Sequence, residues 1–171
     1  NSSFHRMMPI DKTHFSIRMV EGRHLHRCFT DAKEHGEDLK IAITVGVHPA
    51  ISIAGAYQAD WGKDEIDIAN SLLGGKLTLA KLPFSGLNVP SGAEFVMEGK
   101  ILRDKTHPEW MVEMLQTYDH KRIQPVFELE NLYFRNNPIF HDVLSGYSEH
   151  RLLMGMPIES KLNGELKKSF S

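Results

Sequence analysis

The alternation of apolar and polar positions predicts strands as the main elements of this chain. Residues 13–20 alternate between the two types, which is typical of a strand with one buried face. Residues 39–47 form a longer apolar run rich in β-branched side chains, which predicts a buried strand. Three further strands are expected, at residues 76–81, 94–102 and 125–134. Gly99 interrupts the second of these and indicates a β-bulge.

Helices are predicted where apolar residues recur at helical spacing. Residues 25–33 present Leu25, Cys28 and Phe29 on one face, and Gly36 is a typical stop signal. The remaining expected elements are helices at 50–57 and 64–73, turns at 89–92 and 136–138, and a short element at 139–144. Because strands and short helices follow no regular βαβ alternation, the pattern predicts an α+β fold on an antiparallel sheet or barrel.

Composition narrows the class of protein. The chain has 171 residues, enough for one domain with a real core, and its 20 basic and 22 acidic residues give a formal charge of −2. This balance gives no general attraction to nucleic acid, and no apolar run reaches the ~18–20 residues of a membrane span. The single cysteine, Cys28, excludes an internal disulfide. The sequence therefore predicts a cytoplasmic protein with no nucleic-acid partner.

Common local motifs give little chemistry. The sequence contains no glycine-rich phosphate loop and no His-Glu-x-x-His zinc motif. His24 and His26 could ligate a metal from a strand, but at the start of a helix their rings diverge, and surface or capping histidines are the simpler interpretation. Cys28 lies on the apolar face of its helix and is expected to be a core residue.

Several segments, taken in their order along the chain, resemble the UbiD family of prenylated-FMN-dependent decarboxylases and carboxylases. The resemblance rests on Asn1-x-x-Phe4-His5-Arg6-Met7, Ile17-Arg18-Met19, Arg23-His24, Ile43-x-x-Gly46-x-His48-Pro49-Ala50, Asp64-Glu65, Ala69-Asn70-x-Leu72-Leu73-Gly74-Gly75, Val89-Pro90-x-x-Ala93-Glu94-x-Val96-x-Glu98-Gly99-x-Ile101, Thr117-Tyr118, Arg135-x-x-Pro138-Ile139 and His150-Arg151-Leu152-Leu153-x-Gly155-x-Pro157. It implies a split β-barrel of the flavin-reductase type over residues 1–157. Residues 158–171 would then begin a linker to a missing C-terminal domain.

The resemblance also implies a cofactor and metal ions. Prenylated FMN would contact Phe4, His5, Arg6, Arg18, Met19, Val20, Arg23 and His24. The cofactor phosphate would be held through Mn²⁺ (or Mg²⁺), with K⁺ close by, and the matching metal ligands are Asn1, His24 and Glu65. Oxygen ligands together with a phosphate suit such cations. Without the resemblance, Glu65 would simply be a favourable acid in the first turn of a helix.

For catalysis, the resemblance assigns Arg6 as the catalytic arginine and Glu113 as the proton donor. An arginine suits a substrate carboxylate because its planar fork binds both oxygens. On its own, Glu113 would be interpreted as a surface glutamate. The loop departs from the family pattern, because both glycines are absent, Pro108 occupies the position of the first acid and Glu109 follows it. Either Glu109 takes over that role in a reshaped loop, or the role is absent.

The expected function is reversible decarboxylation or carboxylation of an aromatic or α,β-unsaturated acid. The alternative is a non-catalytic flavin-binding split-barrel module, or a subunit that requires a partner. The resemblance further implies N- and C-terminal domains that this chain lacks and a homo-oligomeric parent. Because neighbouring domains close the active site in this family, the isolated piece is expected to fold but to be inactive.

Overall fold

A computed structural model describes residues 2–170 of the chain. The strands are β1 (Met7–Pro9), β2 (His14–Ile17), β3 (Leu39–Val45), β4 (Leu79–Lys81), β5 (Asn88–Pro90), β6 (Phe95–Glu109) and β7 (Arg122–Phe134). The helices are α1 (His24–Glu34), α2 (Pro49–Ala56), α3 (Glu65–Leu72) and α4 (Ser148–Ser169). The fold is thus a mixture of strands and helices, as the sequence pattern predicts.

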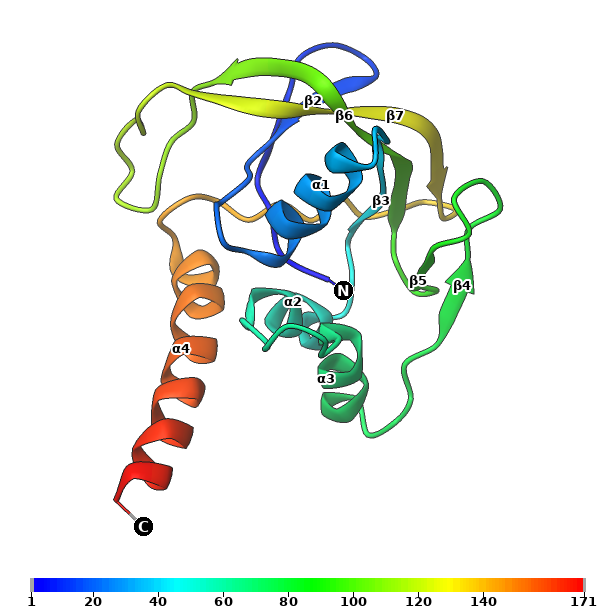
Figure 1. Cartoon of the computed structure of the whole chain (residues 1–171). Coiled ribbons are helices and arrows are strands. Elements are labelled where there is room, and N and C mark those ends of the chain that lie inside the picture. The colour runs from blue at the N-terminus through cyan, green and yellow to red at the C-terminus, as the bar shows by residue number, and fades with distance from the viewer. Residues whose placement is uncertain (1, 171) are drawn as a thin grey trace.

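Five strands form one antiparallel sheet in the order β1-β2-β7-β6-β3. Its centre is the long hairpin of β6 and β7, which crosses the top of the molecule in Figure 1. The strands β4 and β5 pair separately in a small second sheet. Helices α2 and α3 lie below the main sheet, and α4 extends away from it toward the C-terminus (Figure 1). This arrangement brings the segments before β1 and after β2 together with the far end of the β6–β7 hairpin.

The main core lies between the sheet and α1. Ile17, Ile101 and Phe127 come from three adjacent strands and are at most 2% exposed. Leu25 and Phe29 of α1 pack against them, which confirms the apolar helical face expected from the sequence. Core packing therefore fixes β2, β6 and β7 relative to one another, and all three strands lead into the candidate site.

The structure corrects several element boundaries. Strand β6 continues to Glu109, beyond the apolar segment that ends at residue 102. Val89 and Pro90 belong to β5, so the turn expected at 89–92 is confined to Ser91 and Gly92. Residues 139–144 contain no helix or strand, so the short element expected there is wrong. Helix α4 runs without interruption across residues 157 and 158 and includes most of the segment expected to begin a linker. The domain boundary at that point stays a prediction.

The split-barrel topology also stays a prediction. The described strands form an open sheet whose edges are β1 and β3, and no closed barrel is seen within residues 2–170. Over the same residues, no helix combines the length and the apolar character needed to cross a membrane. What the structure shows is an antiparallel sheet with four helices.

We expect Gly99→Ala to destabilise the protein. The register of β6 and β7 shifts between Glu98 and Gly99, which confirms the predicted bulge. A Cβ at Gly99 would overlap the carbonyl oxygen of Glu128 on β7 and lie 2.9 Å from the ring of Phe127. Relieving the overlap must move a strand, at a cost of about 1–3 kcal/mol in the free energy of unfolding. Gly155→Ala in α4 is the matched control, since its Cβ meets no atom within 4 Å and alanine favours a helix. Urea denaturation of both variants measures the difference, and equal stability would contradict this account of the bulge.

Candidate active site

The sheet brings Arg6 and Glu109 together although 103 residues separate them. Arg6 precedes β1, and its carbonyl oxygen accepts a hydrogen bond from the backbone N–H of Arg18, which follows β2. Glu109 is the last residue of β6. Since β2 and β6 both pair with β7, the ends of these strands meet at one edge of the core.

Arg6 is held between two carboxylates. Its Nη2 lies 3.2 Å from Oε1 of Glu109 and 2.9 Å from Oδ2 of Asp119. Glu109 is 1% exposed, and its second oxygen accepts a hydrogen bond of 3.2 Å from the hydroxyl of Ser16. The Nε of Arg6 is buried and has no hydrogen-bond partner in the described structure. The guanidinium is therefore fixed on one side and keeps donor capacity for an anionic ligand.

Asp119 forms a second ion pair, with Arg122, in addition to the one with Arg6. Nη2 of Arg122 donates to its other oxygen, Oδ1, at 3.1 Å. The hydrogen bonds from Arg122 and Arg6 hold the pKa of Asp119 far below its usual value. Burial, together with repulsion from Arg122 and Arg6, lowers the pKa of the nearby Arg18. Three guanidinium groups and two carboxylates thus gather here, which leaves an excess of positive charge.

A second cluster forms where two helices begin. Glu65 is the first residue of α3 and only 2% exposed, and its Oε1 lies 3.2 Å from Nδ1 of His24, the first residue of α1. Its Oε2 accepts a hydrogen bond of 2.9 Å from the backbone N–H of Ser2. The indole of Trp61 meets the His24 ring edge-on, with the ring centres 5.3 Å apart. Glu65 and His24 therefore come together as predicted.

Two of the three predicted metal ligands, His24 and Glu65, lie in this cluster. Asn1, the third predicted ligand, lies outside the described residues. Within residues 2–170, no three His, Cys, Asp or Glu side chains gather closely enough to hold a metal ion. The pair of Glu65 and His24 still fits a cation shared with a phosphate, because that phosphate would supply the further oxygen ligands a hard cation needs.

The residues expected to contact the cofactor lie between these clusters. The segment from Ser2 to Arg6 connects them, because the backbone N–H of Ser2 bonds to Glu65 and the side chain of Arg6 reaches Glu109. Between its end Cα atoms the segment spans at most about 14 Å, and the side chain of Arg6 adds its own length. Within it, the backbone N–H of Phe4 donates to the carbonyl of Gly55 at 2.8 Å. This separation suits a molecule with a phosphate at one end and a reactive ring at the other.

Hydrogen bonds fix most of the other predicted contact residues. Nδ1 of His5 bonds to the carbonyl of Arg18 at 2.9 Å, and burial lowers the pKa of His5. The N–H of Met19 donates to the buried amide oxygen of Gln124 at 2.8 Å. Two other predicted contact residues follow Met19 in the sequence. Val20 is 41% exposed, and the guanidinium of Arg23 faces the side-chain amide of Gln58. These contacts hold the predicted residues in fixed positions along one segment.

Glu113 does not share in the ion pairs that the described structure gives Arg6. It lies in the loop between β6 and β7, where its Oε1 accepts hydrogen bonds from the N–H of Leu115 at 3.0 Å and the hydroxyl of Thr117 at 2.8 Å. The aromatic rings of Trp110 and Tyr118 are in contact across this loop, with their centres 4.7 Å apart. Glu109 thus occupies the position beside Arg6, and the catalytic role predicted for Glu113 stays a prediction.

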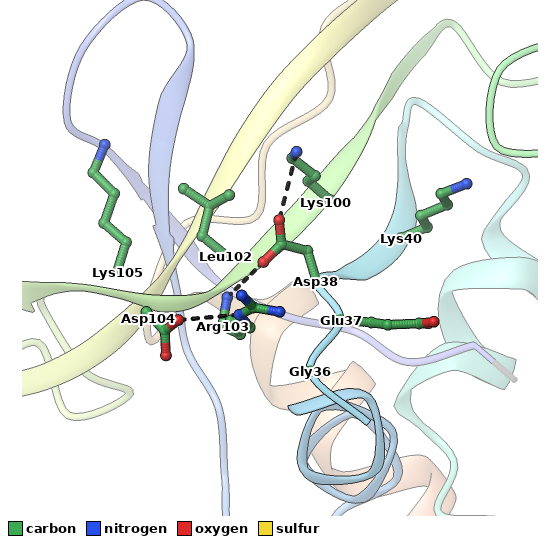
Figure 2. A pocket seen from close by; sticks show the side chains of 9 residues that line it. All are labelled: Gly36, Glu37, Asp38, Lys40, Lys100, Leu102, Arg103, Asp104 and Lys105. Carbon is green, nitrogen blue, oxygen red and sulfur yellow. Dashed lines mark hydrogen bonds and ion pairs between the residues drawn. The ribbon is translucent and has the colours of Figure 1, made fainter. Parts of the chain in front are cut away.

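An open cavity of about 730 Å³ lies elsewhere, near the end of α1 and along β3 and β6. Figure 2 shows that charged side chains line it and that Asp38 faces Lys100 and Arg103. The carboxylate of Asp38 lies 3.5 Å from Nζ of Lys100 and accepts a hydrogen bond of 3.0 Å from the backbone N–H of Arg103. The cavity contains none of the predicted site residues, and two of its ion pairs, Asp38 with Lys100 and Arg103 with Asp104, join lining residues to each other. The cavity therefore does not displace the Arg6 cluster as the candidate active site.

Sequence reasoning missed Ser16, Asp119 and Arg122. Ser16 is one polar residue in an alternating strand, so its type gave no reason to single it out. Asp119 immediately follows the Thr117-Tyr118 segment. Of the three residues, it had the clearest signal in the sequence, an acid next to the loop that matches the family. Arg122 lies at the start of β7, before the apolar run from residue 125 that predicted this strand.

Comparison with known proteins agrees with this geometry. Residues 1–148 match the model of the 3-octaprenyl-4-hydroxybenzoate carboxy-lyase Rift-related domain. This chain belongs to the UbiD family. Among solved structures, a UbiD-class enzyme, HmfF from Pelotomaculum thermopropionicum in complex with prenylated FMN, is 34% identical and superimposes with a TM-score of 0.93. The match covers 97% of this chain and 39% of that one.

Curated relatives are decarboxylases. Anhydromevalonate phosphate decarboxylase of Methanocaldococcus jannaschii is 44% identical over 95% of this chain. Phenolic acid decarboxylase of Escherichia coli O157:H7 is 33% identical over 86% of it. The chain spans 38% of the length of the first relative and 31% of the second. These likenesses support a carboxy-lyase of this family.

Proposed function

We propose that this chain is the cofactor-binding part of a prenylated-FMN-dependent enzyme that decarboxylates, or in reverse carboxylates, an unsaturated acid. The observation that carries the proposal is Arg6, which is fixed by the buried Glu109 and by Asp119 and still has the unpaired Nε. A carboxylate ligand matches a guanidinium held in this way.

The described residues fit the cofactor. Its phosphate would be held by Glu65 and His24 through Mn²⁺ or Mg²⁺, with K⁺ nearby, and its ring would reach the Arg6 cluster along residues 2–6. When bound, the prenylated flavin supplies the sink for the electron pair left by the departing CO₂. HmfF, which is complexed with prenylated FMN in one structure and with FMN in another, supports this assignment.

The residues of this chain would supply binding and proton transfer. Arg6 would bind the substrate carboxylate and orient the bond that breaks. Glu109 lies beside Arg6 and accepts a hydrogen bond from the hydroxyl of Ser16. In the proposal it would take up a proton from water and deliver it to the carbon that loses CO₂. Its burial shields that proton from water. Closure of the site by further domains and assembly into a homo-oligomer remain part of the proposal.

Among unsaturated acids, the relatives favour one that carries a phosphate. Identity is 44% to the anhydromevalonate phosphate decarboxylase and 33% to the phenolic acid decarboxylase. The excess positive charge around Arg6, Arg18 and Arg122 also favours a substrate with a second anionic group. An aromatic acid is the second choice. The ion pair of Glu109 with Arg6 favours the catalytic proposal over the non-catalytic alternative, because it keeps an acid beside Arg6 despite the altered loop.

Release of CO₂ tests this proposal. The full-length protein would be coexpressed with a flavin prenyltransferase, purified with manganese, and given a phosphorylated unsaturated acid or a phenolic acid. We expect CO₂ from the first at a rate well above that from the second. If protein that contains the prenylated flavin releases CO₂ from neither acid, the decarboxylase assignment is wrong. The described chain alone is expected to melt cooperatively but to release no CO₂.

We expect Glu65→Gln to weaken manganese binding. The substitution keeps the size of the side chain and one acceptor for Ser2 but removes the charge that faces His24. Loss of an outer partner of a ligand already costs 10–100-fold in metal affinity, so loss of a ligand charge should cost at least about 100-fold. Titration followed by electron paramagnetic resonance of Mn²⁺, in protein loaded with FMN, measures the change. Glu159→Gln on the exposed face of α4 is the control, and equal affinity of the two variants would place the metal elsewhere.

A further inference from the structure

The two acids beside Arg6 differ in their surroundings. Glu109 is 1% exposed and has one ion-pair partner in the described structure, Arg6. Asp119 is 17% exposed and lies between two guanidinium groups, 2.9 Å from Arg6 and 3.1 Å from Arg122. The row Glu109–Arg6–Asp119–Arg122 therefore alternates in charge.

The elements that carry this row explain why it is rigid. Glu109 ends β6 and Arg122 begins β7, and the two are paired in the register of the hairpin. Between them, the N–H of Asp119 donates to the carbonyl of Met111 at 2.9 Å. The carboxylate of Asp119 is thus anchored through its own backbone and through Arg122 before it meets Arg6.

From this geometry we propose that Asp119 is a positioning residue: it stays ionised and holds the Arg6 guanidinium in the orientation that binds the substrate carboxylate. Glu109 is then the acid that exchanges the proton. The inference rests on the proposed function and adds a residue that the resemblance to the family did not include. The assignment follows from the neighbours of the two acids. Asp119 lies between two guanidinium groups, whereas Glu109 lies between one guanidinium, that of Arg6, and the neutral hydroxyl of Ser16.

Asp119 is not the acid that takes that proton. Its hydrogen bonds from Arg122 and Arg6 favour the ionised form and depress its pKa, as described above. Protonation would leave Arg122 and Arg6 without their shared anion. Glu109 can take up a proton and still donate or accept a hydrogen bond toward the hydroxyl of Ser16. The different neighbours of the two acids therefore divide their roles.

Substitution of Asp119 in the full-length enzyme tests the positioning role. We expect Asp119→Asn to lower kcat/KM by on the order of 10²-fold, because a misplaced binding group has an effect of that size. Asp119→Glu keeps the charge and should recover a large part of the loss. Asp104→Asn is the matched control, since it removes an exposed acid paired with Arg103, 3.0 Å away, and should leave the rate unchanged. A melting temperature within a few degrees of wild type in all variants would separate positioning from folding.

A measurement that needs no turnover tests the pairing itself. In ¹³C NMR of the carboxyl groups, Asp119 should titrate below the usual range of an aspartate in the wild type and at a higher pH in Arg6→Ala. Ordinary titration of Asp119 in the wild type, or full activity of Asp119→Asn, would overturn the inference. If the wild type releases no CO₂ but Asp119 behaves as expected in the NMR experiment, the proposed function fails while the ion pair stands.

Discussion

Glu109→Gln is expected to abolish most of the decarboxylase activity of the full-length enzyme. The amide has nearly the same size and can still accept from the hydroxyl of Ser16, so the fold should survive. It cannot deliver a proton, however, and it no longer forms an ion pair with Arg6. Loss of a general acid typically lowers a rate by about 10²–10⁴-fold. Single-turnover release of CO₂ from cofactor-loaded protein measures the effect on the chemical step.

Two further variants make the result specific. Glu37→Gln changes an exposed glutamate outside the Arg6 cluster and should leave the rate unchanged. Glu113→Gln tests the residue that sequence resemblance assigns as the proton donor. A large loss in Glu113→Gln together with near-normal activity in Glu109→Gln would contradict the assignment based on the structure and restore the one based on the resemblance.

Glu98→Ala is expected to have the largest effect on stability. Glu98 is completely buried on β6, and its carboxylate accepts hydrogen bonds from the N–H and hydroxyl of Ser85, both at 2.6 Å, and from the hydroxyl of Tyr133 at 2.8 Å. It ties the β4–β5 connection to the main sheet. Hydrogen bonds to charged groups contribute about 1.5–3 kcal/mol each and are not additive, so the loss should be about 3–5 kcal/mol. Urea denaturation compares it with Glu37→Ala, for which little change is expected.

The stability that Glu98 supplies should depend on pH. Burial on its own raises the pKa of Glu98, but the hydrogen bonds from Ser85, Tyr133 and the backbone of Phe84 outweigh it and hold the pKa below its ordinary value. A depressed pKa in the folded state gives stability that is present above the unfolded value and is lost as the pH falls through the folded value. The difference in unfolding free energy between wild type and Glu98→Gln should therefore shrink in acid. A difference that stays constant from pH 7 to pH 3 would show that the charge of Glu98 does not contribute.

The spacing of apolar residues predicted those helices and strands whose own sequence carries a clear period. The helix over residues 25–33 and the strand over 39–47 follow from apolar periodicity, and both agree with α1 and β3. The second half of β6 begins with Arg103, Asp104 and Lys105, which carry no apolar period and have no partner on β7 in the register. The strand continues because residues 106–109 pair again with β7, and no local pattern indicates that pairing. Helix α4 contains Pro157 and two glycines, which local propensity disfavours, and no pattern indicated its full length.

The candidate site also contains residues that the sequence predicted and residues that only the structure revealed. Arg6, His24 and Glu65 were predicted because the segments around them resemble the family, and the structure brings His24 and Glu65 within 3.2 Å. Asp119 was not predicted, since its contact with Arg6 spans 113 residues and depends on how a reshaped loop returns to β7. The sequence left open whether Glu109 takes over the role of the first acid or the role is absent. The position of Glu109 beside Arg6, at the end of an unexpectedly long strand, favours the first alternative, which stays a prediction.

The central claim is that substrate and cofactor meet at Arg6. A crystal structure of the full-length protein with prenylated FMN and a non-reacting analogue of the acid tests it most directly. We predict that the analogue carboxylate lies within hydrogen-bond distance of the Arg6 guanidinium, with the flavin phosphate beside Glu65 and His24. A flavin bound elsewhere, for example in the charged cavity of Figure 2, or a carboxylate bound away from Arg6, would contradict the account.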